Sequence, residues 1–494
     1  MNTLDKPRNE TVIVFALSLA AMVVAMMQTL VVPILTLIQT SLGTTTANAS
    51  WVTTATLLSA AVFTPLLGRF GDQHGKKPTL VAVLVVMVAG SVLAATTHSL
   101  GWLIVGRVLQ GAATAIFPLA LSVLREEIRP AKLPGAMALV SGTLAFGSGL
   151  ALVAVGLLTS GHHPDYRSAF WLATALAVIA LVAVVLLVPA TRQKTGGRTD
   201  VLGALSLAAT LVLLLLPITQ GHEWGWSSAR TIGSFAGAVV MAAVWVLVEL
   251  RVREPLVDMR MFVHRPVLFA NAAGLLVGFG SFTSFIGISY LVQMPSKVAG
   301  YGFDASILRA SVAYLLPSAI MSLLAAPVGG RLVRRHGPRV VLALASAFGA
   351  AGFGWIAVDH SHGASVIGAG MLIGVAISFG YAAMPAVIMA SVPHHQSGIA
   401  NGINSISRST GSAIGTAVIT TVLASKPSLS AHLPAGYPAL PAESQFTLSF
   451  VIATVALSLV ALVAWLGLRT PAAVAEAPVA VEAEIAPVSV SVTV

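Results

Sequence analysis

Residues 68–77 read GRFGDQHGKK, and residues 330–339 read GRLVRRHGPR. Gly, Arg, His and Gly stand at the same four offsets in the two stretches, and each stretch follows a proline by three residues, Pro65 and Pro327. Long apolar runs flank both copies. A polar segment that recurs between apolar runs indicates an internal repeat, and only the first copy carries an acid, Asp72.

The composition outside these stretches is that of an integral membrane protein. The chain has 494 residues, of which 56% are hydrophobic and 9% are charged, whereas soluble proteins carry about 25% charged residues. The apolar runs are too long and continuous for barrel strands, so we expect spanning helices and an all-α polytopic membrane protein. The chain has no cysteine, which excludes disulfides and thiolate metal sites.

Fourteen apolar runs are long enough to cross a bilayer, which takes about 20 residues. They are centred near Val23, Leu58, Val88, Thr114, Leu144, Leu181, Thr210, Ala242, Phe279, Pro317, Ser346, Ile377, Gly411 and Leu457. If the N-terminus lies inside, the outer loops hold few basic residues, namely Arg167, Arg230, Lys297, Arg309 and Lys426. This asymmetry predicts cytoplasmic N- and C-termini. It also accounts for the net charge of +10 without a nucleic-acid partner.

The two copies of the repeat lie eight spans apart, so both face the same side of the membrane. Parallel repeats of this kind are common in secondary transporters. Six helices in each half leave two linking helices, an order of 6 + 2 + 6. The expected divisions are a cytoplasmic tail at 1–11, a first bundle at 12–189, a linker at 190–266, a second bundle at 267–468, and a disordered cytoplasmic tail at 469–494.

Five segments together resemble the major facilitator superfamily, and within it the fourteen-helix drug:proton antiporters. They are GRFGDQHGKK, WLIVGRVLQGAATAIFP with Arg107, Gln110 and Gly111, TDVLGALSLAATLVLLLLPITQGHEWGW, REPLVDMRMF, and SGIANGINSISRSTGSAIGTAV. The resemblance implies the major facilitator fold and a plasma-membrane exporter of small organic molecules that works by alternating access. It implies a proton gradient as the driving force and no cofactor. We expect a monomer with a small-molecule substrate, no ATP, since no phosphate-binding loop is present, and no enzymatic activity.

Two segments depart from the family pattern. In MMQTLVVPILT, Met27 stands where the family has an acid, and GTLAFGSGLALVAVG has no proline. These departures keep a non-transporting membrane sensor as an alternative, and a metabolite uptake permease of the same fold is the other alternative. No Asp or Glu stands near the middle of any span, which favours neutral, zwitterionic or anionic substrates over organic cations, and Arg107 favours anions.

The first repeat copy is a candidate gate. The resemblance implies that Asp72 pairs with the opposite half near a helix N-terminus, whose dipole favours a carboxylate. The alternative is a solvated turn that only sets orientation. The gating residues are Gly68, Arg69, Asp72, Gly75, Lys76 and Lys77, with Arg331, Arg334 and Arg408 in the second half. For Arg408 the alternative is a charge at the cytoplasmic end of its helix.

Arg107 is a candidate cavity residue. It lies roughly 9 Å from the outer end of its helix at 1.5 Å per residue, and an arginine near mid-span costs about 2.5–3.5 kcal/mol. The alternative is that its side chain snorkels to the outer surface. The expected cavity residues are Gln28, Arg107, Gln110, Asn271, Tyr290 and Gln293, and the expected helix-packing residues are Gly111, Gly149, Gly402, Gly411 and Gly415. No metal site is indicated.

Overall fold

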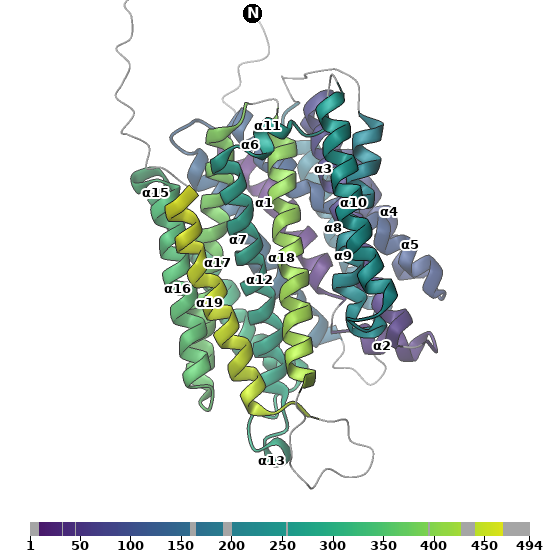
Figure 1. The fold of residues 1–494 in the computed structure, drawn as a ribbon, viewed down its shortest axis with the longest axis vertical. Helices are drawn as coiled ribbons and strands as arrows, with labels where there is room; N and C mark the ends of the chain where they lie inside the picture. Colours follow the sequence, from purple (N-terminus) through teal and green to yellow (C-terminus); the bar gives the residue numbers. More distant parts are fainter. Residues whose placement is uncertain are drawn as a thin grey trace, which may run out of the picture.

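The protein is a bundle of long helices in the computed structural model (Figure 1). The structure describes residues 9–31, 33–44, 46–158, 165–190, 200–252, 255–393, 396–425 and 440–467. The tail expected at 469–494 lies outside the described residues, as does most of the tail expected at 1–11.

The first half contains six spans. They are α1 (Glu10–Thr29), α3 (Thr46–His74), α4 (Lys76–Thr96), a span of three parts made of α5 (Leu100–Gly111), η1 (Ala112–Ala115) and α6 (Ile116–Glu127), then α7 (Leu133–Leu158) and α8 (Tyr166–Leu187). The short helix α2 (Leu35–Ser41) joins α1 to α3. A 3-10 turn within a long helix, such as η1, often marks a functional hinge.

The second half repeats this pattern after two linking helices, α9 (Val201–Trp224) and α10 (Ala229–Arg251). Its spans are α12 (Arg265–Gln293), then α14 (Ile307–Arg309), η2 (Ala310–Leu315) and α15 (Leu316–His336) as one span, then α16 (Pro338–Val358), α17 (Gly363–Ser391), α18 (Ser397–Ser425) and α19 (Glu443–Gly467). The short helices α11 (Met259–Phe262) and α13 (Ser296–Ala299) lie in connections.

Thirteen described helices are long and apolar enough to cross a membrane. The fourteenth span is α18, which has 29 residues but carries more Ser, Thr and Asn than the others. It packs among the other spans, against α12 and α3, so its polar residues lie inside the bundle. The order of 6 + 2 + 6 helices expected from the repeat therefore describes the fold.

The repeated stretch is mostly helical rather than a loop. In the first copy α3 continues to His74, and α4 begins at Lys76 after a single residue, Gly75, with φ of 113°. In the second copy α15 and α16 are separated only by Gly337, with φ of 82°. A positive φ is strained for residues with a Cβ, which explains why both copies need glycine at this offset.

The first glycine of each copy lies where the two halves cross. A Cβ on Gly68 of α3 would lie 2.9 Å from the carbonyl oxygen of Gly398 at the start of α18. A Cβ on Gly330 of α15 would lie 2.7 Å from the Cα of Gly135 at the start of α7. The second helix of each half thus packs on the fifth helix of the other half, and the doubled sequence reflects a doubled helix crossing.

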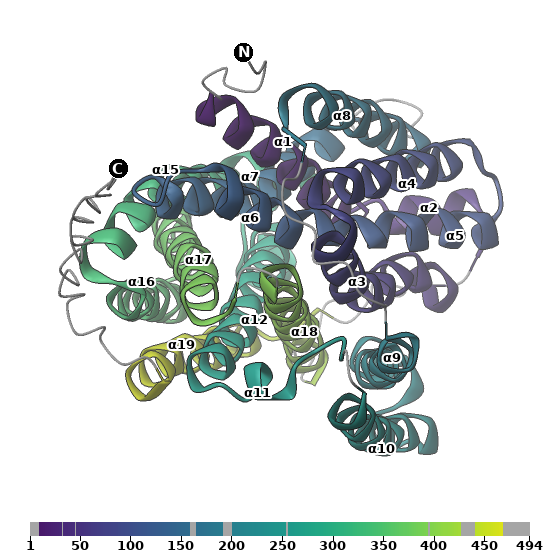
Figure 2. The ribbon, with the colours of Figure 1, turned by 90° about the horizontal axis from the view of Figure 1, so that it is seen from above.

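The linking helices lie at the edge of the bundle. Viewed from above, α9 stands beside α3 and α18, and α10 lies on the outer side of α9 (Figure 2). Helix α9 contacts α3 of the first half and α18 of the second half, and the Gln220 amide of α9 donates to Thr54 Oγ1 of α3 at 3.3 Å. Much of α10 is exposed, including Val239 and Leu250, as expected for a helix that faces lipid.

Candidate functional site

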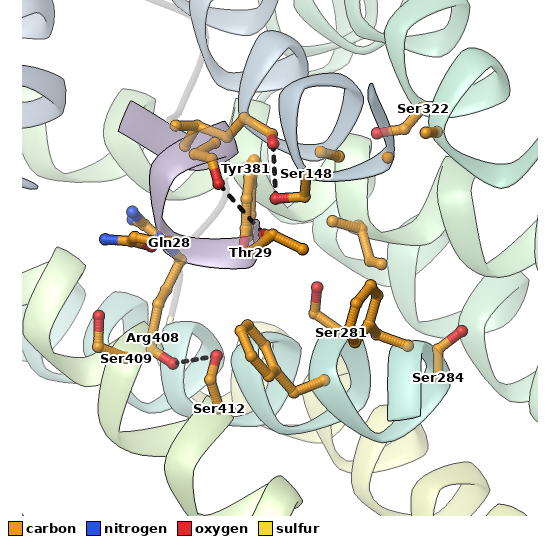
Figure 3. Close-up of a pocket in the computed structure, with 18 of the residues that line it drawn as sticks. Gln28, Thr29, Ser148, Ser281, Ser284, Ser322, Tyr381, Arg408, Ser409 and Ser412 are labelled. Carbon is orange, nitrogen blue, oxygen red and sulfur yellow. Dashed lines mark hydrogen bonds between the residues drawn. The ribbon is translucent and has the colours of Figure 1, made fainter. Parts of the chain in front are cut away.

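A cavity lies between the two halves, with residues of both halves in its wall (Figure 3). The first half contributes residues of α1, α3, η1, α6 and α7. The second half contributes residues of η2, α12, α15, α17 and α18. A site of this kind, on the interface of the two repeats, is where secondary transporters hold their substrates.

The wall combines apolar surface with hydroxyl groups. Leucine, valine, isoleucine and phenylalanine side chains alternate with serines, namely Ser148, Ser281, Ser284, Ser318, Ser322, Ser405, Ser409 and Ser412. The buried Ser322 hydroxyl has no hydrogen-bond partner in the described structure. Such a wall suits a ligand with an apolar body and a few polar groups.

Arg408 of α18 is the one formally charged side chain among the described residues that line the cavity. Its guanidinium carbon lies 4.9 Å from the ring centroid of Phe117, in α6 of the first half, and 4.9 Å from that of Tyr381, in α17 of the second half. Its terminal nitrogens donate to Asn404 Oδ1 and to Ser405 Oγ, each at 3.2 Å. The guanidinium is therefore held between rings from opposite halves.

A second layer of residues fixes the position of Arg408. Asn404 Nδ2 donates to the carbonyl oxygen of Ala270 at 3.1 Å and to Asn271 Oδ1 at 3.2 Å, both in α12. These bonds turn Asn404 Oδ1 toward Arg408. Asn271, expected in the cavity wall, acts from behind it through Asn404. Gly278 of α12 packs directly on the backbone carbonyl of Arg408.

Arg107 is buried away from this cavity. It is 1% exposed, and it neither lines the cavity nor snorkels to the surface. Its Nε donates to the Val52 carbonyl at 3.2 Å, and its Nη1 donates to the Met27 carbonyl at 3.2 Å and to Gln110 Oε1 at 2.6 Å. The Met27 carbonyl is in the last turn of α1, where the helix dipole favours a cation. The backbone at the end of α1 thus supplies an acceptor for Arg107.

The other expected cavity residues are spread out. Gln28 lines the cavity. Gln110 Nε2 donates to Ser91 Oγ at 2.9 Å, so Gln110 belongs to the buried network of Arg107. Tyr290 is 51% exposed near the end of α12, and the Gln293 amide bonds to Ser289 of its own helix. Neither Tyr290 nor Gln293 lines the cavity.

The first repeat copy joins the two halves at one end of the bundle. Asp72 Oδ2 accepts a hydrogen bond of 3.0 Å from the backbone N–H of Gly398 at the start of α18. The carboxyl group is buried, with Lys76 Nζ 3.8 Å from Oδ1, and Lys76 also pairs with Glu126. Asp72 thus joins the two halves at a helix N-terminus, where a carboxylate is stabilised.

Three more hydrogen bonds join the halves at this end. Ser397 Oγ donates to Ser122 Oγ at 3.3 Å, Arg125 Nη2 donates to the Val392 carbonyl at 3.0 Å, and Arg334 Nη1 donates to the Ala131 carbonyl at 2.8 Å. In the second repeat copy a donor, Arg334, therefore stands where the first copy has an acceptor. Of the other basic gating residues, Lys77 bonds to Val185 of its own half, Arg69 is half-buried and Arg331 is exposed.

The glycines expected in packing lie at close helix contacts. A Cβ on Gly111 would lie 2.6 Å from the Thr56 carbonyl oxygen, and one on Gly415 would lie 2.6 Å from the Phe279 carbonyl oxygen. Gly411 packs on Leu275 and Gly149 on Ala319 with even less room, and Gly402 packs on Pro65.

Phe117, Tyr381 and Asn404 were not expected from the sequence as site residues. A signal for Asn404 exists, because Asn404, Ser405 and Ser412 lie at i−4, i−3 and i+4 from Arg408, on one polar face of α18. The two rings come from other helices, and the sequence carries no sign of their contact with Arg408.

Residues 17–416 and 279–492 match the sequence profile described as Major Facilitator Superfamily. The tetracenomycin C resistance and export protein of Streptomyces glaucescens is 29% identical over 83% of this chain and 75% of its own length. The cephamycin export protein CmcT of Amycolatopsis lactamdurans is 28% identical over 78% of this chain and 80% of its own, and the probable actinorhodin transporter of Streptomyces coelicolor is 27% identical over 78% and 67%.

Two solved structures share the fold. The human organic anion transporter MFSD10 (TETRAN) matches with a TM-score of 0.64 at 14% identity, over 93% of this chain and all of its own. The proton:xylose symporter XylE matches with a TM-score of 0.61 at 12% identity, over 92% of this chain and 95% of its own.

Proposed function

The chain belongs to the Major Facilitator Superfamily, and from this membership we propose that it exports small organic molecules from the cell by alternating access. It is a multi-pass cell-membrane transporter and not an enzyme. Three of its relatives carry names of antibiotic exporters or transporters. These names support outward transport as the direction for this chain.

The observation that carries the proposal is a cavity lined by both halves, together with hydrogen bonds that join the halves at one end of the bundle. A hydrogen bond in a folded protein contributes about 0.5–1.5 kcal/mol net. Contacts made of a few such bonds can break and form again with a small change in free energy. Rocking of one half against the other would open this end and close the opposite one.

The proton-motive force is the proposed energy source, and a monomer is the proposed working unit. The sequence holds no phosphate-binding loop for ATP. The distribution of Lys and Arg supports cytoplasmic termini, and with that orientation the hydrogen bonds of Asp72 and Arg125 would lie on the cytoplasmic side.

The test is efflux from preloaded cells that make the protein. The cells would be loaded with a panel of anionic, neutral and cationic fluorescent compounds and then energised, with and without an uncoupler. We expect energy-dependent efflux above the vector control. Ser409→Phe fills the cavity and should abolish efflux, whereas Ser458→Phe, on the exposed surface of α19, should leave it intact.

Other outcomes select the alternatives. Faster entry of a compound, blocked by Ser409→Phe, would identify an uptake permease. No movement of any compound, with folded protein in the membrane, would overturn the export proposal and favour a non-transporting role.

A further inference from the structure

The charge of the cavity is positive and uncompensated within the described structure. Arg408 is the charged residue of the wall, and the partners that hold it, Asn404 and Ser405, are neutral. The other arginine buried in the spans, Arg107, also bonds to neutral groups. Two fixed cations in a low-dielectric interior attract anions and repel cations.

The rings beside Arg408 stabilise its charge only in part. A cation gains less from an aromatic face than an arginine near mid-span loses by leaving water. Buried charges normally have a partner of opposite sign. The described wall of the cavity offers Arg408 no acidic partner, so an anionic ligand would supply the missing negative charge.

The geometry leaves room for such a partner. A guanidinium has five N–H donors in a planar fork that suits a carboxylate. Hydrogen bonds to Asn404 and Ser405 use two of these donors. Serine hydroxyls, including that of Ser322, can bind further oxygens of a ligand, and Phe282, Phe285 and Ile377 offer apolar surface for its body.

We infer that Arg408 is the residue that selects the substrate, and that the substrate class is organic anions with a flat apolar body and a carboxylate or similar acidic group. This inference rests on the proposal that the cavity is the transport site. Phe117 and Tyr381 place their rings beside the guanidinium, and Asn404 acts as a positioning residue.

The experiment uses three probes of one shape and different charge: 2-naphthoate, neutral 2-naphthamide and the cation 2-naphthylmethylammonium. Binding to the full chain in nanodiscs is measured by equilibrium dialysis, with empty nanodiscs as the control for partition into lipid. We expect wild type to bind 2-naphthoate at least tenfold more tightly than 2-naphthamide. A hydrogen bond to a charged group supports a preference of this size.

Arg408→Gln should weaken 2-naphthoate binding about tenfold to a hundredfold. It should change 2-naphthamide binding by less than about twofold, which also reports that the cavity is intact. Arg408→Lys keeps the charge without the planar fork and should retain part of the preference. Ser458→Ala, on the exposed surface of α19 and outside the cavity wall, is the matched control and should leave the order of the probes unchanged.

Several outcomes would overturn the inference. One is equal 2-naphthoate binding by wild type and Arg408→Gln, and another is a wild type that prefers the cation or shows no preference. If Arg408→Gln fails to fold, loss of the anion preference in Arg408→Lys to the level of the amide would also count against it. If Arg408→Gln exports anions as well as wild type, the inference is wrong and the export proposal stands. If wild type binds anions but exports nothing, the export proposal is wrong and the inference about binding stands.

Discussion

Two single residues at equivalent positions of the repeat join the two halves of this protein. Asp72 and Arg334 occupy the same offset in the two copies of the repeat, and each bonds to a backbone group of the opposite half. One accepts and the other donates. The contact with the opposite half therefore lies at the same offset in both copies, but the side chain is an acceptor in the first copy and a donor in the second.

Asp72→Asn should impair transport without unfolding the protein. The amide keeps the size of the side chain but removes the charge that strengthens its bond to the Gly398 N–H. A charge-assisted hydrogen bond contributes about 1.5–3 kcal/mol against about 1 kcal/mol for a neutral one, so the closed end should open more often. The measurement is the rate of efflux at matched expression.

Lys77→Gln is the control for this prediction, because Lys77 lies in the same stretch but bonds to Val185 in its own half. It should change efflux little. Normal efflux by Asp72→Asn would mean that the bond to Gly398 does not govern the cycle.

Gly337→Ala should destabilise the protein by about 1–2 kcal/mol, the cost of a positive φ for a residue with a Cβ. Nothing lies within 4 Å of the position that a Cβ would take, so strain of the backbone is the sole cause. Gly233→Ala, in α10 with ordinary helical backbone and equal space, should cost nothing or stabilise. Thermal unfolding of the two variants in detergent gives the comparison, and equal melting temperatures would contradict it.

The sequence predicts the depth of a buried charge but not the direction it faces. Arg107 lies as deep as expected, yet its side chain turns toward the end of α1 and not toward the cavity. Arg408 was expected at a gate, and the structure shows that it lines the cavity. Which neighbour a helix face meets depends on contacts between residues far apart in the chain, such as Phe117 with Arg408.

At the scale of elements, close crossings of helices set the position of the site. Helices α12 and α18 pack along glycines from both sides, with Gly278 against Arg408 and Gly411 against Leu275. These contacts bring Asn404 within reach of Asn271. The packing of one helix pair thus determines where the guanidinium lies.

Gly411→Ala should push α12 and α18 apart, because its Cβ has no room against the backbone of Leu275. Overpacking of this kind costs about 1–3 kcal/mol, and we also expect weaker 2-naphthoate binding as Asn404 moves. Gly354→Ala in α16 is the matched control, since the nearest atom to its Cβ would lie 4.0 Å away. A Gly411→Ala protein as stable as wild type would show that the crossing can relax.

The elements themselves were largely predictable. Fourteen apolar runs and the repeated stretch gave the 6 + 2 + 6 order, because hydropathy and repeats are local properties of the chain. The division of two spans was not expected, including the π turn η2 that precedes Pro317. Proline lacks an N–H and disturbs the turn before it, but sequence alone does not say how a helix absorbs that disturbance.

At the scale of the whole molecule, the orientation in the membrane can be tested with single cysteines, because the chain has none of its own. His98 and Pro130 are exposed at opposite ends of the bundle, after α4 and after α6. If both termini are cytoplasmic, an impermeant maleimide should label His98→Cys in intact cells. It should label Pro130→Cys only after permeabilisation, and the reverse pattern would invert the proposed topology.

The charge of the substrate also sets how transport is driven. In the described part of the chain, no carboxylate lines the cavity to carry a proton in exchange. A monoanion that leaves a cell with a negative interior is itself driven outward. A potential of 100 mV supplies about 2.3 kcal/mol per charge, which supports roughly a 50-fold concentration ratio.

In proteoliposomes with equal pH on both sides, a potassium gradient with valinomycin should therefore drive 2-naphthoate toward the positive side, while 2-naphthamide should not respond to the potential. Arg408→Gln should lose most of the potential-driven flux. The membrane potential would then be the part of the proton-motive force that drives export, so a pH gradient without a potential should drive little transport. If the pH gradient alone drives 2-naphthoate and the potential does not, the coupling is to a proton carried by a residue outside the cavity wall, and the anion does not supply the driving charge.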